Sequence, residues 1–401
     1  MERKILANIK ENLTNDEIVL IIGSRQVGKT TSMRQTFDYL KQKGELCHFL
    51  NLEDPDYLRL LNDSPKKLFN IIPFDKEKRN YLFVDEIQYL KDPSNFLKYF
   101  YDEYKGKIKI IASGSSAFYL DKKFKDSLAG RKKILYLLTL SFDEFLKFKG
   151  EDDLYKTDLS KDLPLQLQEK ITPLYLEYLT YGGYPRVVLA KSIQEKQEVL
   201  KDLAYSYIKK DIYEADINQE EVFFRLMKIL SGQVGELVNV SELSATLGVT
   251  KITVDKYLAV MQKSFHIFLT RPFYKNIRKE LTKMPKVYFG DLGMRNFFKN
   301  NFNNFYDRDD RGQLLENGVF CQFLNQHDTE DIKFWRTRDK KEVDFVIEEK
   351  RAFEVKTKSS NYNDEKYKLF LASYPQISLN YIVLEKEKQI DKSKLFYPWQ
   401  I

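Results

Sequence analysis

A glycine-rich stretch near the N-terminus ends in a lysine and a threonine. Residues 23–30 read GSRQVGKT, after the apolar run EIVLII and before a helical pattern. Gly23 and Gly28 would let this loop close around phosphate oxygens, with its N–H groups pointing inward at a helix N-terminus. Lys29 would reach the β- and γ-phosphates, and the Thr30 hydroxyl would bind Mg²⁺. The order strand, loop, helix predicts a P-loop for ATP rather than a chance glycine turn. The predicted nucleotide-binding residues are Gly23, Ser24, Arg25, Gln26, Val27, Gly28, Lys29, Thr30 and Thr31.

Two adjacent acidic residues follow a second apolar run. Residues 80–87 read NYLFVDEI, so Asp85 ends a predicted strand and Glu86 comes next. Asp85 could hold Mg²⁺ through water. Glu86 could polarise the attacking water as a general base. Alone, the pair would suit a solvated strand end, but together with the P-loop it predicts ATP hydrolysis.

Three further residues could contact or sense the γ-phosphate. Ser113 ends the apolar run KIKIIAS and Ser115 follows it, and either could report whether the phosphate is present. Arg131, in SLAGRKK, could stabilise transition-state charge, in its own site or in a neighbouring subunit. An ordinary surface arginine explains Arg131 equally well.

The elements that would position these residues are short apolar runs separated by helix-length segments. Buried parallel strands have this composition, so we expect a parallel sheet with helices on both faces. The runs are residues 17–22, 45–52, 80–85, 107–113 and 132–138.

Several phrases resemble bacterial and archaeal ATPases of the AAA type. In the first third these are GSRQVGKTT, FVDEIQYL, IIASGSSA, SLAGRKK and LSFDEF. Such proteins commonly end in a domain of uncharacterised function, and YGGYP, KVYFGDLGMRN, LLENGVF and RTRDKKEVDFVI are similar to that domain. The position of strand 45–52 between the two motifs resembles the ATPases with an additional strand and a catalytic glutamate. The resemblance implies ATP binding and hydrolysis, often in oligomers.

A helix-turn-helix phrase lies in the middle of the chain. VSELSATLGVTKITVDKYL, residues 240–258, reads as two helices joined by a turn at residues 247–249. The residues expected to face outward from the second helix, where DNA-binding proteins of this kind carry base contacts, are Thr250, Lys251, Thr253 and Lys256. No dense Lys/Arg cluster accompanies the helix, so a small packing module is an equal alternative.

Alternating residues near the C-terminus predict a hairpin with one charged face. If Asp344 pairs with Glu354 across two antiparallel strands, then Phe345 faces Phe353 and the apolar side chains share one face. A slip of one residue would mix apolar and charged groups on both faces. The other face would present Asp344, Glu354 and Lys356.

Asp followed by Glu-x-Lys on adjacent strands resembles metal-dependent nucleases of the restriction type. In those proteins the carboxylates hold Mg²⁺ and the lysine helps to orient or deprotonate water. Glu316, in the helical phrase LLENGVFCQFL, matches the further acidic residue that such folds often supply. The resemblance implies metal ligation by Glu316, Asp344 and Glu354. A nuclease-like fold kept without cleavage is the alternative.

Composition sets the broad class. Net charge is +7, from 66 Lys plus Arg against 59 Asp plus Glu, a mild excess that permits nucleic-acid binding. Cys47 and Cys321 lack partners at metal-ligand spacing, so we expect two reduced thiols. We see no membrane-spanning run and no apolar signal core, and so expect a cytoplasmic protein without a membrane partner.

These observations predict an α/β protein of four parts. We expect a P-loop AAA-type ATPase domain with a parallel sheet (1–150), a helical lid or linker (151–220), a winged helix (221–285) and an α/β restriction-nuclease-like domain (286–401). The predicted activity is Mg²⁺-dependent ATP hydrolysis that gates DNA processing by the last domain. The alternative is a regulatory or scaffolding ATPase whose C-terminal domain binds partners. DNA and a second copy of the chain are possible partners.

Overall fold

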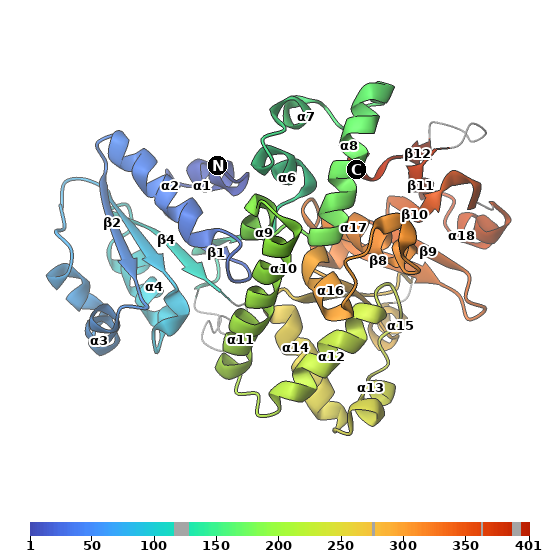
Figure 1. Cartoon of the computed structure of the whole chain (residues 1–401). Helices are drawn as coiled ribbons and strands as arrows, with labels where there is room; N and C mark the ends of the chain where they lie inside the picture. The colour runs from blue at the N-terminus through green and yellow to red at the C-terminus, as the bar shows by residue number, and fades with distance from the viewer. Residues whose placement is uncertain (116–127, 275–276, 362–363, 387–393) are drawn as a thin grey trace. The chain divides into compact units, whose positions relative to one another are not determined.

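The computed structural model (Figure 1) describes residues 1–115, 128–274, 277–361, 364–386 and 394–401. The predicted sites fall within these ranges. The chain divides into two compact units, and unit 1 comprises Met1–Leu138 with Lys263–Phe265. Unit 2 comprises Thr139–Gln262 and His266–Ile401. Within the described residues, no helix is long and apolar enough to cross a membrane.

Unit 1 is built on a parallel sheet of five strands in the order β2-β3-β4-β1-β5. The five runs predicted from sequence form these strands, and every residue of β1, β3 and β4 is buried, which accounts for their apolar composition. In space, β4 separates β1 from β3, so the strands that lead to the two nucleotide motifs flank a third strand. The strands are β1 (Ile18–Ile22), β2 (Leu46–Asn51), β3 (Asn80–Asp85), β4 (Ile108–Gly114) and β5 (Lys132–Tyr136).

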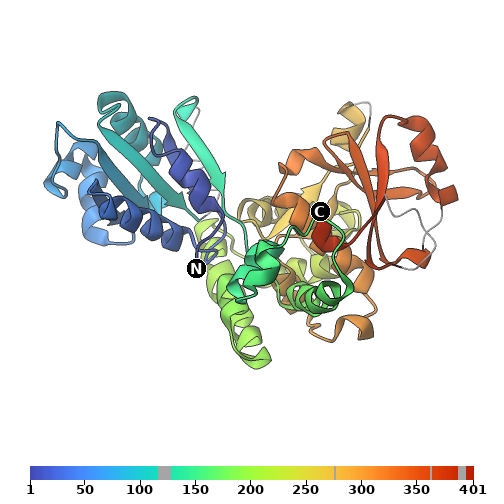
Figure 2. The same ribbon diagram turned by 90° about the horizontal axis from the view of Figure 1, so that it is seen from above.

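Helices cover both faces of this sheet, as predicted (blue to cyan in Figure 2). On one face Phe37 of α2 meets the rings of Phe49 and Phe83 edge-on, with centroids 6.0 and 5.7 Å apart. On the other face Phe96 and Phe100 of α4 belong to the core formed by the alternate strand residues. The helices of unit 1 are α1 (Ile5–Glu11), α2 (Lys29–Gln42), α3 (Pro55–Asp63) and α4 (Pro93–Glu103), with the 3-10 turns η1 (Pro65–Asn70) and η2 (Ile87–Tyr89).

Unit 2 begins with helices, as predicted. They are α6 (Phe142–Phe148), α7 (Asp152–Lys156), α8 (Leu165–Tyr181), α9 (Pro185–Leu189), α10 (Ile193–Asp202) and α11 (Ile208–Glu214), with a π-helical turn over Leu203–Tyr207. The YGGYP phrase forms the break between α8 and α9, where Gly182 has a φ of 76°. A Cβ on Gly183 would overlap the carbonyl oxygen of Leu140, so this close backbone approach requires glycine.

The YGGYP and FGDLGMRN phrases contact each other directly. The Asp291 carboxylate accepts hydrogen bonds from the backbone N–H groups of Gly183 (2.8 Å) and Met294 (2.9 Å). Burial raises the pKa of Asp291 to about 6, although these hydrogen bonds act in the opposite direction. Asn296 donates to the carbonyl oxygens of Leu179 and Thr180. These motif residues therefore join the helices of unit 2 to one another.

Four helices and a two-stranded antiparallel sheet follow among the described residues. The turn predicted at residues 247–249 is present: α13 ends at Gly248, whose φ is 70°, and α14 begins at Lys251. Leu243 and Val254 are buried, whereas Lys251 and Lys256 are exposed. The elements are α12 (Glu220–Gly232), α13 (Val240–Leu247), α14 (Lys251–Lys263), β6 (Ile267–Thr270), α15 (Ile277–Thr282) and β7 (Lys286–Phe289), of which β6 pairs with β7.

The C-terminal part of unit 2 contains a second sheet of five strands in the order β12-β11-β10-β9-β8 (orange to red in Figure 2). β8, β9 and β10 are antiparallel neighbours, and β10 and β11 are parallel. Phe345 pairs with Phe353, the predicted register. The elements are α16 (Leu292–Lys299), α17 (Arg311–Leu324), β8 (Ile332–Arg336), β9 (Glu342–Ile347), β10 (Arg351–Lys358), α18 (Lys368–Ser373), β11 (Ser378–Glu385) and β12 (Leu395–Phe396), with 3-10 turns at 305–307, 329–331, 359–361, 364–367 and 398–400.

Candidate functional site

The P-loop connects the carboxyl end of β1 to the N-terminus of α2. Gly28 precedes α2 with a φ of 103°, a conformation that L side chains rarely adopt. A Cβ on Gly23 would overlap the carbonyl oxygen of Leu137. The Lys29 ammonium lies 2.8 Å from the carbonyl oxygens of Gly23 and of Ser24. The loop thus has the glycines, the helix N-terminus and the cation that a phosphate cradle needs.

Asp85 lies beside the P-loop because β3 and β1 flank β4. Its carboxylate accepts hydrogen bonds from the hydroxyls of Ser113, on β4, and of Thr30, at the start of α2. Burial raises the pKa of Asp85 above its ordinary value, although these two hydrogen bonds and the Lys29 charge act in the opposite direction. A hydroxyl next to a buried carboxylate fits Mg²⁺, which prefers oxygen ligands and keeps several waters. A cation here would also offset the desolvation of the Asp85 charge.

Glu86 is held in a left-handed conformation directly after β3. Its φ and ψ are 57° and 49°, which is unfavourable for a residue with a Cβ. Its N–H donates to the Ser113 hydroxyl over 3.1 Å, and its carboxylate accepts from the Gln88 amide. Gln88 also donates to the Ser115 hydroxyl over 2.9 Å. The strained backbone and these contacts fix Glu86 next to Asp85.

Gln88 was missed in the sequence. Its side chain is buried, and it joins Glu86 to Ser115. Because Gln88 lies two residues after Glu86 in DEIQ, its place beside the acidic pair could have been considered. The contact between Gln88 and Ser115 spans 27 residues of sequence, so no local pattern predicts it.

Arg131 lies at the amino ends of the strands, opposite the end of the sheet that carries the P-loop. Its carbonyl accepts from the N–H of Ile18, the first residue of β1, whereas the P-loop follows the last residue of β1. Five residues at ~3.3 Å each separate these ends by roughly 15 Å. The Arg131 guanidinium is 2.9 Å from the Asp102 carboxylate. The structure therefore does not bring Arg131 to the phosphate site of its own chain.

The three acidic residues predicted in the C-terminal domain lie in one charged cluster. Asp344 accepts from the N–H of Val355 over 2.8 Å, and the Lys356 ammonium lies 3.9 Å from Asp344 and 2.5 Å from Glu354. Lys366 is 3.2 Å from the same Glu354 oxygen. The other carboxylate oxygen of Glu354 is buried without a hydrogen bond.

Glu316 approaches this cluster from α17, but its direct partners are on β7. The Tyr288 hydroxyl donates to it over 2.6 Å, and the Lys286 ammonium is 3.3 Å away. Lys286 also lies 2.6 Å from Glu342. Burial and the neighbouring Asp344 charge raise the pKa of Glu354 above its ordinary value.

Cations already pair with these carboxylates. Among the described residues, no three His, Cys, Asp or Glu side chains are arranged to hold a metal. At Glu354 and Asp344 the place beside the carboxylates is taken by the Lys356 ammonium, and one Glu354 oxygen has no hydrogen bond. The sequence did not predict a role for Lys286, Tyr288 or Lys366. For the first two, the only sequence signal is the alternation in KVYF, which puts them on one strand face.

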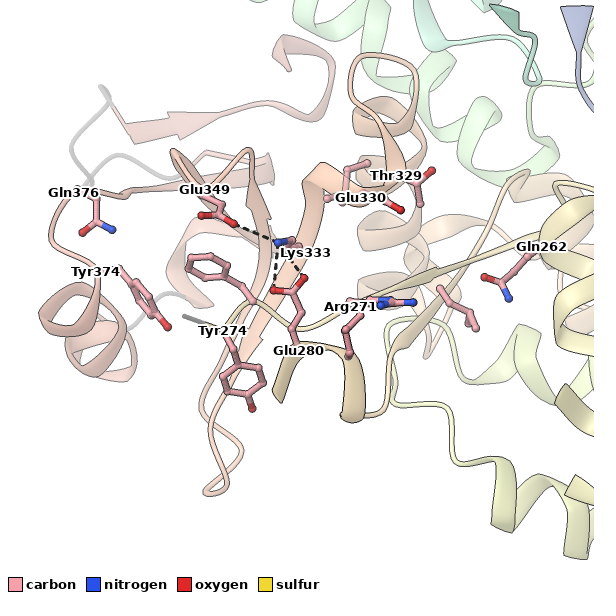
Figure 3. Close-up of a pocket in the computed structure, with 14 residues that line it drawn as sticks. Gln262, Arg271, Tyr274, Glu280, Thr329, Glu330, Lys333, Glu349, Tyr374 and Gln376 are labelled. Atoms are coloured by element: carbon pink, nitrogen blue, oxygen red, sulfur yellow. Dashed lines mark hydrogen bonds and ion pairs between the residues drawn. The ribbon is translucent and has the colours of Figure 1, made fainter. Parts of the chain in front are cut away.

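A separate pocket lies within unit 2, and its lining includes residues of β6, α15 and β8 (Figure 3). It has a volume of about 760 Å³. In this pocket the Lys333 ammonium lies between two carboxylates, 3.1 Å from Glu280 and 3.3 Å from Glu349. Burial would lower the pKa of Lys333, but the hydrogen bonds to these glutamates raise it. The Lys333 charge in this pocket is thus paired with two carboxylates.

Family models match three parts of the chain. Residues 15–146 match a model described as an AAA domain. Residues 172–304 and 311–401 match two models, each described as a domain of unknown function, DUF8612 and DUF4143. Together with the strand order, the first match defines unit 1 as a P-loop domain of the AAA ATPase type.

Similar proteins extend over most of the chain. An uncharacterised protein of Haemophilus influenzae is 27% identical over 82% of this chain and 79% of its own length. One from Methanocaldococcus jannaschii is 27% identical, over 90% and 79%. One from Mycobacterium tuberculosis is 22% identical, over 89% and 74%.

Two solved structures also match over much of their length. The Aeropyrum pernix ORC1 protein in complex with DNA is 11% identical with a TM-score of 0.33, over 74% of this chain and 91% of that chain. AMPPCP-bound DnaA from Aquifex aeolicus is 15% identical with a TM-score of 0.30, over 65% and 86%.

Proposed function

We propose that unit 1 binds and hydrolyses ATP with Mg²⁺. The observation that carries this proposal is the convergence of Lys29, Thr30, Asp85 and Glu86 at the carboxyl ends of neighbouring parallel strands, with Ser113 between them. The P-loop N–H groups and Lys29 bind the phosphates. Thr30 and Asp85 supply oxygen ligands for Mg²⁺, which when bound would neutralise negative charge on the phosphate oxygens.

In this proposal Glu86 accepts the proton of the attacking water. The left-handed backbone and the Ser113 hydroxyl hold Glu86 in place. Gln88 orients the Glu86 carboxylate and Ser115 holds Gln88. Ser113 touches both acidic residues and is the better placed of the two serines to respond to the γ-phosphate.

Steady-state hydrolysis by the full chain tests the proposal. We expect MgATP turnover in the wild type, loss of ATP binding in Lys29→Ala, and retained binding without turnover in Glu86→Gln. Glu103→Gln, which changes an exposed carboxylate at the end of α4, is the matched control and should remain active. Turnover by Glu86→Gln at the wild-type rate would remove Glu86 from its role.

We also propose that the C-terminal part of unit 2 processes DNA under control of the ATP cycle. Asp344, Glu354 and Lys356 share one patch, and the helix α17 followed by β8, β9, β10, α18 and β11 supports the resemblance to restriction-type nucleases. In this reading α13, α14 and the β6–β7 strands form a winged helix that binds DNA. Lys251 and the exposed Ile252, at the start of α14, and Thr250 directly before it would face the DNA.

Cleavage of linear and supercoiled DNA with Mg²⁺ or Mn²⁺, with and without ATP, tests this second proposal. Glu354→Gln should abolish cleavage and leave ATP turnover intact. Glu365→Gln, an exposed residue near α18, is the matched control. ATP-independent cleavage would contradict gating. Absence of cleavage alongside ATP turnover would favour a regulatory or scaffolding ATPase.

A further inference from the structure

A buried arginine at the start of the chain contacts the P-loop from outside. Arg3 precedes α1, and its side chain is buried in unit 1. One guanidinium nitrogen donates to the carbonyl oxygen of Val27 over 2.5 Å. Another donates to the carbonyl oxygen of Leu138 over 3.0 Å. Arg3 therefore bridges the P-loop and the segment that follows β5.

The contact with Val27 fixes the direction of an N–H group in the phosphate cradle. A trans peptide is planar, so the carbonyl of Val27 and the N–H of Gly28 point in opposite directions. Arg3 holds that carbonyl from one side, and the Gly28 N–H consequently points to the other. Gly28 is the residue before α2, where an N–H group directed at an anion is most favourable.

The contact with Leu138 attaches the Arg3 side chain to a segment that is itself hydrogen-bonded to the sheet. The N–H of Leu137 donates to the carbonyl of Ile22 over 2.8 Å, which ties this segment to the end of β1. The carbonyl of Leu137 also packs against Gly23, the first residue of the P-loop. The segment 137–138 thus supports the P-loop directly at Gly23 and through Arg3 at Val27.

The geometry requires a guanidinium. Its planar group can donate to two carbonyl oxygens at once in a fixed arrangement, whereas a lysine ammonium is a single point on a flexible chain. Hydrogen bonds from a charged donor in a buried place are also stronger than neutral ones. Without them the peptide between Val27 and Gly28 would be free to rotate, since Gly28 tolerates many backbone conformations.

We infer that Arg3 is a positioning residue of the nucleotide site, which orients the Gly28 N–H toward the phosphates and does not touch ATP. This inference rests on the proposed binding of ATP to unit 1. It assigns part of the affinity for ATP to a residue twenty amino acids before the P-loop motif.

Binding of a fluorescent ATP analogue and steady-state turnover, measured on the full chain, test this role. Arg3→Met removes both donors and keeps the aliphatic stem. We expect its Kd and KM for ATP to rise by about tenfold while kcat falls less than threefold, because the loss concerns phosphate binding. Arg3→Lys should recover part of the affinity, since one ammonium can still reach one carbonyl.

Arg79 offers a matched control within unit 1. Its guanidinium also donates to two backbone carbonyls, those of Thr14 (2.8 Å) and Asn15 (2.5 Å), at the edge of the sheet opposite the P-loop. Arg79→Met should lower the free energy of unfolding and leave the Kd for ATP unchanged. Equal loss of affinity in Arg79→Met and Arg3→Met would show a general effect of destabilisation and overturn the inference.

The two proposals fail in different ways. If the wild type binds ATP no better than Lys29→Ala, the proposed function fails and the role of Arg3 fails with it. If the wild type binds ATP and Arg3→Met binds it equally well, only the role of Arg3 is overturned.

Discussion

The ammonium of Lys286, on β7, lies 2.6 Å from the carboxylate of Glu342, on β9. Lys286 is fully buried, and Glu316 lies on its other side at 3.3 Å. Burial lowers the pKa of Lys286, but the surrounding carboxylates raise it above its ordinary value. One cation thus links the β6–β7 strands to the α17 helix and to the C-terminal sheet.

We predict that Lys286→Met will destabilise unit 2 strongly. The substitution would leave Glu316 without its ammonium partner, although Glu342 keeps Arg336 at 2.8 Å. Removing one partner of a buried pair costs about 3–5 kcal/mol. Chemical denaturation monitored by circular dichroism measures the free energy of unfolding. Lys350→Met is the control, because its pair with Glu348 over 3.1 Å is exposed and should contribute about 0–1 kcal/mol. Equal effects of the two substitutions would contradict the prediction.

The strands of unit 1 and the place of its nucleotide motifs could be predicted because the signals are local. Apolar runs of five to six residues mark β1 and β3, and in a parallel sheet the motifs after their carboxyl ends share one edge. The same rule places Arg131 at the opposite end of the strands, since it precedes β5, although the sequence does not show whether it acts on its own site or on a neighbour's. The hairpin register at Phe345 was also predictable from alternation.

Long-range side-chain contacts could not be predicted. Arg3 meets Val27 across 24 residues and Leu138 across 135, and no periodicity in the sequence connects them. Lys286 lies on a strand of four residues, too short to give a clear pattern. Its partners come from a helix and from another strand, so the ion pairs depend on how these elements pack.

The buried Lys109 should make the stability of unit 1 depend on pH. Burial lowers the pKa of Lys109 to about 8, the Arg79 charge acts in the same direction, and Glu17 and Asp16 oppose both. Between pH 8 and the ordinary pKa of 10.5, the unfolded chain binds more protons than the folded chain, so stability rises with pH.

We predict that the unfolding free energy of the wild type, relative to Lys109→Met, will increase by about 2–3 kcal/mol from pH 7.5 to pH 10. Thermal or chemical unfolding of both proteins in matched buffers measures this difference. Other lysines and tyrosines titrate in both proteins, and their contributions cancel. A difference that stays constant or falls over this range would contradict the prediction.

Arg131 should not contribute to ATP binding within its own chain. Its guanidinium pairs with Asp102 at the sheet edge opposite the P-loop. Arg131→Ala should therefore leave the Kd for ATP unchanged, measured by titration at a protein concentration where the chain is monomeric. A rise in Kd of tenfold or more under these conditions would contradict the position of Arg131.

A second copy of the chain could still receive Arg131. In that case Arg131→Ala and Glu86→Gln would each lose turnover, by a factor on the order of 10³ for the arginine. Mixing the two variants would restore activity in those sites that combine an intact Glu86 with an intact Arg131. Loss without restoration would indicate that Arg131 acts on the structure of its own subunit.

Ser113 should matter for turnover more than Ser115. The Ser113 hydroxyl donates to Asp85 and accepts from the N–H of Glu86, so it orients the metal ligand and the general base together. We predict that Ser113→Ala will lower kcat on the order of tenfold to hundredfold with a smaller change in KM, because misplacement of catalytic groups affects the reaction more than binding. Ser115→Ala is the control. The Ser115 side chain is equally buried and accepts from Gln88, one step removed from Glu86, so kcat should fall less than fivefold. Equal losses in the two variants would show that neither hydroxyl has a specific role, and a loss confined to Ser115→Ala would move the sensing function to Gln88.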